Sequence, residues 1–415
     1  MQDVSAQEPE RPSPPVVRVW LTQDGEKTVR KRRPWLFGGH VQRVSEPAAT
    51  GATAIVYDEK RRFVAVGMYD ADSPILVRLL EFGQQTSIDV PWLWGRLNAA
   101  LAIRVAVADP QTNGWRLVYG ESDGLPGLVI DRYASVAVVK FYTGAWARFA
   151  ESIYDWCMAL DGVTAVVARC ARSVAAVAGA QSWIVDGSVV RGDHQPGQQV
   201  QFLERGIRLF CDPCRGQKTG FFLDQRENRG RVGEMSAGKS VLNVFAYNGG
   251  FSLHAARGGA RHVTSLDISR PALLEAERNF AANKEDTNIR QCDHQTMAGD
   301  AFVLLAELAQ QRKTWDIVII DPPSFAKEAA HIDRAVAAYQ KLARLGAALV
   351  SRGGTLVLAS CSSRVTPVQF EDVMRAAVQS AGRRVIRCDR TGHPPDHPVG
   401  FEQAEYLKCL FMEVS

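Results

Sequence analysis

The first part of the chain contains short apolar runs with the spacing of strands. Residues Val16–Leu21, 54–57 and 63–68 either alternate between apolar and polar positions or run apolar between turn signals. Residues 58–62 separate the last two runs, as a β-hairpin requires. The pattern predicts a small β-rich domain over residues 16–90.

Helical spacing begins after this segment. Within residues 91–108, apolar side chains recur every three or four positions, at Trp94, Leu97, Leu101 and Val105. Strand-like runs and a second helical run follow, at residues 117–119, 128–130, 136–141 and 149–160. We expect a linker helix and a small central α+β domain over residues 91–205.

Beyond residue 205 the pattern changes to strand, loop and helix in turn. The strand-like and helical runs lie at residues 241–245, 251–257, 263–266, 272–282, 302–308, 317–320, 335–350 and 355–359. Such alternation predicts a parallel sheet with helices on both faces. Two further strand-like runs, residues 384–388 and 406–412, close this domain, which we expect to span residues 206–415.

Composition adds limits rather than a function. The chain has 415 residues, a net charge of +4, and eight cysteines without a regular framework, which indicates reduced thiols and a cytoplasmic location. Residues 1–15 are polar and proline-rich, and we expect a disordered leader there rather than a signal peptide. No stretch has the roughly 18 uninterrupted apolar residues of a membrane span, so a soluble protein is expected.

A glycine turn after the first strand of the third domain indicates a cofactor site. Residues 246–250 read Ala-Tyr-Asn-Gly-Gly and lead into a helix, where a backbone without side chains can approach a ligand closely. Asp267 ends the second strand, in position to accept hydrogen bonds from ribose hydroxyls, and Asp300 follows the expected third strand. The spacing is not that of a dinucleotide fingerprint, which disfavours a nicotinamide oxidoreductase.

This order of elements is that of a class I S-adenosylmethionine methyltransferase, a Rossmann-like α/β fold with a mostly parallel seven-stranded sheet. Taken singly, the glycine turn is equally typical of a structural turn, and Asp267 of a helix cap, although Ser269 is the better-placed cap. The predicted cofactor-binding residues are Phe222, Asp224, Gln225, Asn243, Phe245, Tyr247, Asn248, Gly249, Asp267, Ile268, Asp300, Ala301 and Asp321.

Two residues at neighbouring strand ends predict the chemistry. Asp321 opens the rigid turn Asp-Pro-Pro-Ser after one apolar strand, and Cys361 follows the next strand. Such a turn suits recognition of the edge of a base, and a thiol suits attack on it. Because C5 of cytosine is a weak nucleophile, a thiolate must first add to C6 before C5 can take a methyl group.

We therefore predict Cys361 and Asp321 as catalytic residues of a cytosine C5-methyltransferase. Asp321 would hold N3 and the exocyclic amine and favour a protonated N3. The thiol must be ionised, so a pKa lowered by nearby positive charge, including the cationic cofactor, is expected. The alternative for Cys361 is a small buried hydrophobic residue, which is the usual fate of a free cysteine.

Residues 218–229 precede the first strand of the catalytic sheet and have two interpretations. One is a turn and an amphipathic helix capped by Asp224. The other, which we favour, is a gate over the cofactor, with Asp224, Gln225 and Arg226 near the cofactor or an RNA phosphate. No metal site is expected, because Cys211 and Cys214 lack a second ligand pair and the loop with His393, Asp396 and His397 is better suited to anchoring.

A basic segment in the first domain indicates an RNA partner. Arg30, Lys31, Arg32 and Arg33 can contact phosphates while Trp35 stacks on a base, and Arg226 is a further candidate. The alternative is a solvated charged face.

The chain closely resembles the ribosomal RNA large subunit methyltransferase I family from residue 16 to the C terminus. The resemblance rests on several long and rare runs, at residues 33–37, 120–128, 218–220, 222–226, 243–251, 321–323, 361–362 and 396–399. It implies an N-terminal PUA domain, a small central domain and a C-terminal methyltransferase domain, often dimeric. It also implies methylation of one cytosine C5 in large-subunit ribosomal RNA, with Cys361 as nucleophile.

Relatives, like this chain with Ser324, lack a second cysteine after Asp-Pro-Pro, so another base would release the product. Two other functions stay open on the sequence: a guanine N-methyltransferase, which needs no thiol, and a non-catalytic RNA-binding protein. Extrusion of the target base is expected in either enzymatic case.

Overall fold

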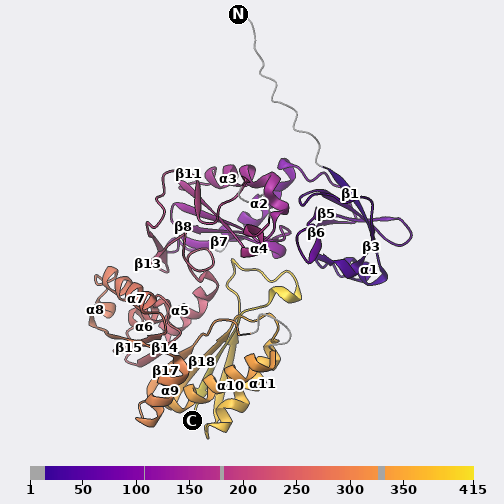
Figure 1. Ribbon diagram of the computed structural model, residues 1–415. Helices are drawn as coiled ribbons and strands as arrows, with labels where there is room; N and C mark the ends of the chain where they lie inside the picture. Colours follow the sequence, from indigo (N-terminus) through magenta and orange to yellow (C-terminus); the bar gives the residue numbers. More distant parts are fainter. Residues whose placement is uncertain (1–14, 107, 178–181, 326–331) are drawn as a thin grey trace, which may run out of the picture.

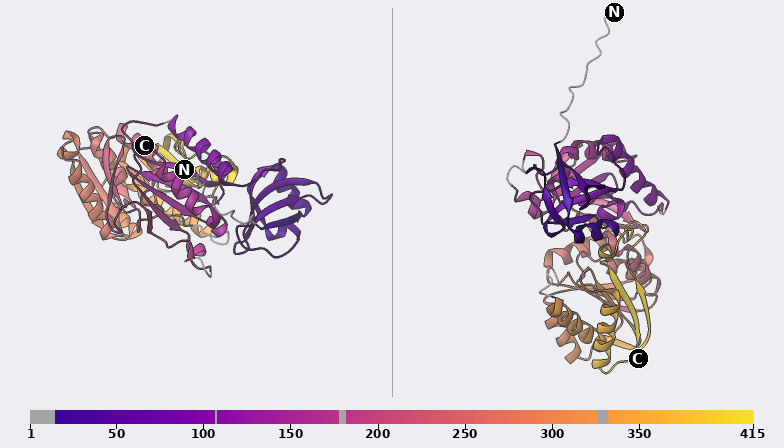
Figure 2. Two further views of the ribbon diagram at one scale, coloured as in Figure 1. Left: turned by 90° about the horizontal axis from the view of Figure 1, so that it is seen from above. Right: turned by 90° about the vertical axis from the view of Figure 1, so that its right-hand side faces the viewer.

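The computed structural model describes residues 15–106, 108–177, 182–325 and 332–415. Three sheet-containing domains follow one another along the chain, coloured indigo, magenta and orange to yellow in Figure 1. The first domain stands to one side of the other two, as the left view of Figure 2 shows. Apart from Pro15, the predicted leader lies outside the described residues.

The first domain is a six-stranded sheet in the order β2-β6-β5-β4-β1-β3. Its elements are β1 (Val16–Leu21), α1 (Gln23–Arg30), β2 (Trp35–Phe37), β3 (Val41–Val44), β4 (Thr53–Tyr57), β5 (Phe63–Tyr69) and β6 (Ile75–Phe82). The expected hairpin is confirmed, since β4 and β5 pair antiparallel. Apolar side chains of alternate strand positions, among them Val17, Val19 and Leu21, form its core.

The central domain is a five-stranded sheet in the order β11-β10-β9-β8-β7. Its elements are α2 (Val90–Val105), β7 (Gly114–Tyr119), β8 (Leu128–Tyr133), β9 (Val136–Phe141), α3 (Ala150–Met158), β10 (Ala165–Cys170), α4 (Arg172–Ala175) and β11 (Ser188–Arg191). Asp89 caps α2 by accepting from the Trp92 amide, and Pro91 fits the first helical turn, where no amide donor is needed.

A hairpin joins the central and catalytic domains. Strands β12 (Val200–Glu204) and β13 (Ile207–Cys211) pair antiparallel and precede helix α5 (Arg226–Glu234). Phe202 on β12 packs edge-on against Tyr133 of the central domain and Phe221 of the catalytic domain, each at 5.2 Å between ring centroids. The hairpin therefore extends the apolar core from one domain to the next.

The catalytic domain is a seven-stranded sheet in the order β16-β15-β14-β17-β18-β20-β19. Its strands are β14 (Ser240–Val244), β15 (His262–Asp267), β16 (Asp293–Ala298), β17 (Trp315–Ile320), β18 (Val350–Ser360), β19 (Val385–Thr391) and β20 (Lys408–Val414). All pairs are parallel except those that β20 forms with β18 and β19. The prediction of a mostly parallel seven-stranded sheet is thus confirmed.

Helices cover both faces of this sheet, as predicted. Alternate strand residues serve opposite faces: Val241 and Ile317 pack with α6 (Gly250–Arg257), whereas Leu242 and Val318 pack with α10 (Ile332–Leu349). The remaining helices are α7 (Arg270–Ala282), α8 (Thr287–Gln291), α9 (Ala301–Gln310) and α11 (Pro367–Ser380). Burial on both faces explains why these strands read as continuous apolar runs in the sequence.

The segment between β19 and β20 leaves the sheet and reaches the central domain (Figure 1). There the amide of Gly400 donates to Ser122 Oγ at 3.2 Å, and Arg104 of α2 donates to the carbonyl oxygen of Asp396 at 3.0 Å. Across the described part of the chain, no helix is both long and apolar enough to cross a membrane.

Candidate active site

Asp321 and Cys361 lie at the same edge of the catalytic sheet. Asp321 directly follows β17 and Cys361 directly follows β18, and these parallel neighbours pair Ile320 with Leu358. Because the carboxyl ends of parallel strands meet at one edge, both side chains belong to one site. The charge of Asp321 influences the pKa of Cys361, which shows the same proximity.

The carboxyl of Asp321 has a pKa close to neutral pH. Burial, followed by the negative charge of Asp224, raises the pKa of Asp321 to about 7, while Lys218 and a hydrogen bond with Gln225 oppose the shift. A carboxylic acid that titrates near pH 7 can both donate and accept a proton under physiological conditions.

The thiol of Cys361 differs from the expectation. A pKa lowered by positive charge was predicted, but burial and the charge of Asp321 raise the pKa of Cys361 to about 11. Lys218 opposes this shift without reversing it. The prediction was wrong for the protein's own groups, because it counted the cations near the thiol and omitted burial, the largest cause, and the charge of Asp321.

The segment before the catalytic sheet closes over this edge. Lys218 donates to Asp224 Oδ2 at 2.7 Å, and Tyr406, just before β20, donates to the same oxygen at 2.6 Å. The Lys218 ammonium lies 4.6 Å from the ring centroid of Phe222. Phe222 in turn packs edge-on against Tyr247 at 5.3 Å, which brings the segment against the glycine turn.

Asp224 is therefore not a helix cap. Helix α5 begins at Arg226, and Gln225 at its N-cap makes no side-chain cap. Burial acts to raise the pKa of Asp224, but Lys218, His397 and Tyr406 together hold it well below its usual range. Asp224 is an anion beside Asp321, and this charge contributes to the raised pKa of Asp321.

The turn after β14 has an unusual backbone. Phe245, Tyr247 and Gly249 have φ angles of +61°, +49° and +79°, a region that residues other than glycine seldom adopt. Asp267 supports the turn, since its Oδ2 accepts from the Tyr247 amide at 2.8 Å. Strain of this kind is typical of binding sites, where surrounding structure holds the backbone in place.

Other predicted cofactor residues occupy varied positions at this edge. Asp300 caps α9 by accepting from the amides of Phe302 and Val303, and Ala301 is the first residue of that helix. Ile268, which follows β15, is 72% exposed. Asn248 is buried, and its carbonyl accepts from Asn279 of α7.

Asn243 lies deeper than predicted. It is 1% exposed, and its amide donates to Ser252 Oγ of α6 at 2.9 Å, which is hydrogen-bonded to Ser265 of β15. This internal chain of polar groups fixes α6 against the sheet. The amide nitrogen of Asn243 therefore has a structural role, while its Oδ1 has no partner among the described residues.

Two buried acceptors test whether these residues suit S-adenosylmethionine. Within the described residues, Asp224 Oδ1 and Asn243 Oδ1 have no hydrogen-bond partner. Buried acceptors seldom stay unpaired, and the cofactor carries an ammonium group and ribose hydroxyls as donors. Asp224 lies at the edge of the sheet beside the strained turn, so the residues present fit the cofactor.

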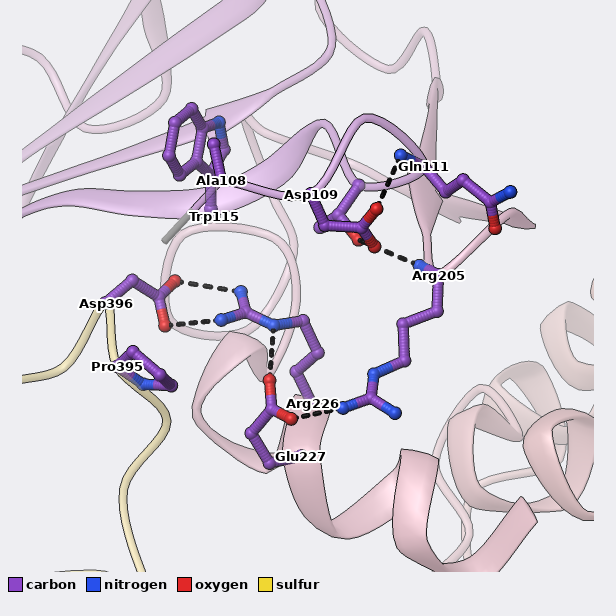
Figure 3. Close-up of a pocket in the computed structure, with 10 residues that line it drawn as sticks. Ala108, Asp109, Gln111, Trp115, Arg205, Arg226, Glu227, Pro395 and Asp396 are labelled. Carbon is purple, nitrogen blue, oxygen red and sulfur yellow. Dashed lines mark hydrogen bonds and ion pairs between the residues drawn. The ribbon is translucent and has the colours of Figure 1, made fainter. Parts of the chain in front are cut away.

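Arg226 is buried and paired with a carboxylate, which disfavours its predicted contact with an RNA phosphate. It is 7% exposed, and its two terminal nitrogens donate to Asp396 at 3.0 and 2.9 Å, while Nε donates to Glu227. This pair lines a cavity of about 360 Å³ between the central domain and α5 (Figure 3). The guanidinium is used in a domain junction, and neither Asp321 nor Cys361 lines the cavity.

The loop that carries Asp396 is anchored by hydrogen bonds and a ring contact. Asp396 also accepts from the Arg116 amide at 3.0 Å and from His397 at 3.1 Å. His393 packs edge-on against Tyr406 at 4.5 Å. Among the described residues, no group of three or more His, Cys, Asp or Glu side chains is arranged to hold a metal ion.

The basic segment of the first domain lies on its surface. Lys31 and Arg32 are exposed, Arg33 is half-buried, and Arg30 pairs with Glu26 at 2.9 Å. Trp35 instead faces the other domains: its indole donates to Glu121 at 3.0 Å and packs edge-on against Phe401 at 5.2 Å. This favours a domain contact for Trp35 over base stacking.

Sequence reasoning missed three residues of the site. Lys218 was recognised only as part of a motif, and Tyr406 and Lys408 only as strand residues. The sequence signal for Lys408 was its place within the otherwise apolar last strand, because a lysine is rarely buried without a partner or a function.

Comparisons with known proteins agree with this architecture. The sequence pattern of the S-adenosylmethionine-dependent methyltransferase family matches residues 194–412, and that of the PUA-like domain matches residues 19–82. The ribosomal RNA large subunit methyltransferase of Deinococcus radiodurans is 43% identical over 407 residues, covering 97% of this chain and 98% of the relative. The ribosomal RNA large subunit methyltransferase I of Alteromonas mediterranea is 35% identical, with 96% and 99% covered.

Solved structures share the fold. A crystal structure of a protein described as a methyltransferase complexed with SAH has a TM-score of 0.80 at 22% identity, covering 96% of this chain and all of that one. A protein from Streptococcus mutans described as a SAM-dependent methyltransferase has a TM-score of 0.79 at 21% identity, with 95% and 99% covered.

Fold and site together define a class I methyltransferase that uses S-adenosylmethionine and carries a PUA-like domain. Within that class, the chain belongs to the ribosomal RNA large subunit methyltransferase family.

Proposed function

We propose that this enzyme methylates a cytosine at C5 in large-subunit ribosomal RNA through a transient bond between Cys361 and C6 of the base. The single observation that carries the proposal is the placement of Cys361 and Asp321 on adjacent strand ends within one electrostatic site. A thiol there has no evident use in methylation of an exocyclic nitrogen. The RNA substrate is inferred from the names of the relatives.

Asp321 has the properties that the first step requires. Its pKa of about 7 lets it accept a proton from the Cys361 thiol and pass a proton to N3 of the base. As the thiolate adds to C6, the C5–C6 π electrons shift to the C4–C5 bond. The C4–N3 π electrons shift to N3, which takes the proton. C5 then has the enamine character that attack on a methyl group needs.

The return steps restore both groups. When bound, S-adenosylmethionine supplies an electrophilic methyl group on a sulfonium. After C5 has taken the methyl, its proton leaves to a base, the C6–S bond breaks, and N3 returns its proton to Asp321. Cys361 then leaves as the thiolate and is ready for another turnover.

The cofactor is proposed to lie along the strand ends of β14, β15 and β16. Phe245, Tyr247 and Gly249 would contact it through the backbone of their turn, with Asp267 accepting from ribose and Asp300 near the adenine. Phe222 and Asp224 would close over it from the segment before the sheet.

The decisive experiment uses two cysteine variants. Cys361→Ala should abolish methylation of ribosomal RNA, whereas Cys388→Ala, which removes another partly exposed thiol, should leave it intact. Full activity of Cys361→Ala would replace this proposal with methylation of a nitrogen. RNA with 5-fluorocytosine should trap a wild-type adduct that withstands denaturation, because fluorine cannot leave as a proton does.

Further parts of the proposal concern partners and position. Bisulfite mapping of ribosomal RNA from a deletion strain should show one lost protection, which would identify the cytosine. The family resemblance also implies a homodimer, which light scattering of the purified protein tests directly.

A further inference from the structure

Lys408 is a buried cation beside the nucleophile. It is the first residue of β20, is 1% exposed, and pairs in the antiparallel ladder with Ser360 of β18, one residue before Cys361. Within the described chain it forms no ion pair with a carboxylate; its ammonium instead donates to main-chain carbonyls. A buried ammonium in such surroundings is costly and requires a compensating use.

The two carbonyls that Lys408 holds belong to the active site. One is that of Ser362, directly after Cys361, and the other is that of Tyr406, at 2.9 Å. The hydroxyl of Tyr406 donates to Asp224, whose charge acts on Asp321. Lys408 thus connects the turn that carries the thiol with the pair of acids.

The electrostatics agree with this geometry. Burial lowers the pKa of Lys408 to about 8, and the charge of Cys361 opposes that shift. The ammonium is therefore mainly protonated at neutral pH and close enough for a thiolate at Cys361 to stabilise it. The attraction is mutual, so the ammonium favours the thiolate, although Lys218 is the cation that lowers the pKa of Cys361 most.

We propose that Lys408 is a positioning residue for the nucleophile: it fixes the turn at residues 360–362 and supplies the positive charge against which the Cys361 thiolate forms. This inference rests on the proposed role of Cys361. The family resemblance and the motifs of the sequence do not assign Lys408 a role.

Alkylation of Cys361 by iodoacetamide tests the inference without RNA. The rate is followed by mass spectrometry of the tryptic peptide of residues 353–364, which contains only this cysteine. Because the thiolate is the reactive form, Lys408→Met should slow alkylation at a fixed pH near 8 by about tenfold. Lys408→Arg, which keeps the charge, should retain most of the wild-type rate.

Arg383 offers a matched control at the opposite end of β18. Its guanidinium holds the carbonyls of Ala347 and Val350, each at 2.7 Å. Arg383→Met removes a cation from carbonyls at the end of α10 and the start of β18 and should lower the melting temperature without changing the pH dependence of Cys361 alkylation.

A neutral donor separates charge from structure and serves if the Met variant does not fold. Lys408→Gln can still donate to a carbonyl, so a purely structural role predicts wild-type alkylation in this folded variant, and that result would overturn the proposal. Slower alkylation that Arg alone restores would support it. Retained methylation by Cys361→Ala would remove the proposed function while leaving the alkylation result readable.

Discussion

Asp224 and Asp321 place two carboxyl groups in one site with pKa values displaced in opposite directions. Burial disfavours both anions, but Lys218, His397 and Tyr406 hold the pKa of Asp224 well below its usual range. Among the described residues, Lys218 and Gln225 oppose the shift at Asp321 only in part, and burial together with the charge of Asp224 raises its pKa to about 7. A pair of this kind assigns one residue as a fixed anion and the other as the group that exchanges protons.

The pH dependence of methylation should report this exchange. Between pH values of about 7 and about 11, Asp321 and Cys361 together carry one proton. The reactive form, a thiolate beside a protonated Asp321, carries the same number of protons, so its share does not change with pH in this range. Single-turnover methylation should therefore rise with pH up to about 7 and then stay level until about pH 8, where the Lys408 ammonium begins to lose its proton. In Asp321→Asn any residual rate should keep rising over that range; a plateau in this variant would contradict the assignment.

Removal of the fixed anion should move the same profile. Asp224→Asn takes a negative charge away from Asp321, which favours the ionised form and lowers its pKa. The acidic limb of the methylation profile is expected to shift down by roughly one pH unit. Tyr406→Phe removes a hydrogen bond from Asp224 without changing its charge and should shift the limb less. An unchanged limb in Asp224→Asn would show that the two acids do not interact.

The Arg226–Asp396 pair should govern stability. Truncation of one partner leaves the other as an unpaired buried charge, so Asp396→Ala should lower the free energy of unfolding in urea by about 3–5 kcal/mol. The double variant Arg226→Met with Asp396→Leu removes both charges and should lower it much less. Burial opposes ionisation, yet His397 and Arg226 hold the pKa of Asp396 well below its usual range. The cost should therefore be present above the unfolded value of about 3.9 and shrink as pH falls below it.

An exposed pair provides the comparison for that measurement. Glu285→Ala breaks the surface pair with Arg208 and should change the unfolding free energy far less. Equal costs for Glu285→Ala and Asp396→Ala would refute the role of the buried pair at the domain junction.

RNA affinity should depend on the first domain rather than on Arg226. Lys31→Ala with Arg32→Ala should weaken RNA binding and reduce the slope of log affinity against log salt by about 0.7–0.9 for each phosphate that the variant no longer neutralises. Lys284→Ala with Lys313→Ala, two exposed lysines of the catalytic domain, controls for the same loss of two charges. The Arg226→Met and Asp396→Leu pair should leave the slope unchanged; a reduced slope there would restore the predicted role of Arg226 in RNA binding.

The sequence by itself determined the architecture and the location of the catalytic edge. Period-2 runs marked β1, β4 and β5, and alternation of strands with helices marked the parallel sheet, because side-chain burial follows the geometry of each element. In the first domain it missed β2 and β3, which are short, and β6, whose apolar run does not alternate with period 2. Motifs at strand ends located Asp321 and Cys361 because parallel strands bring those ends together.

Only the tertiary structure decided the charge partners and the pKa values of these groups. Arg226 donates to Asp396, which is 170 residues further along the chain. Lys408 donates to the carbonyl oxygen of Ser362 from another strand, and the negative charge of Asp224 raises the pKa of Asp321. A pKa depends on burial and on every charge within a few ångströms, and in this site those charges come from segments far apart in the chain. A sequence motif can identify a thiol and an acid, but it does not give the distances between charges that determine their pKa values.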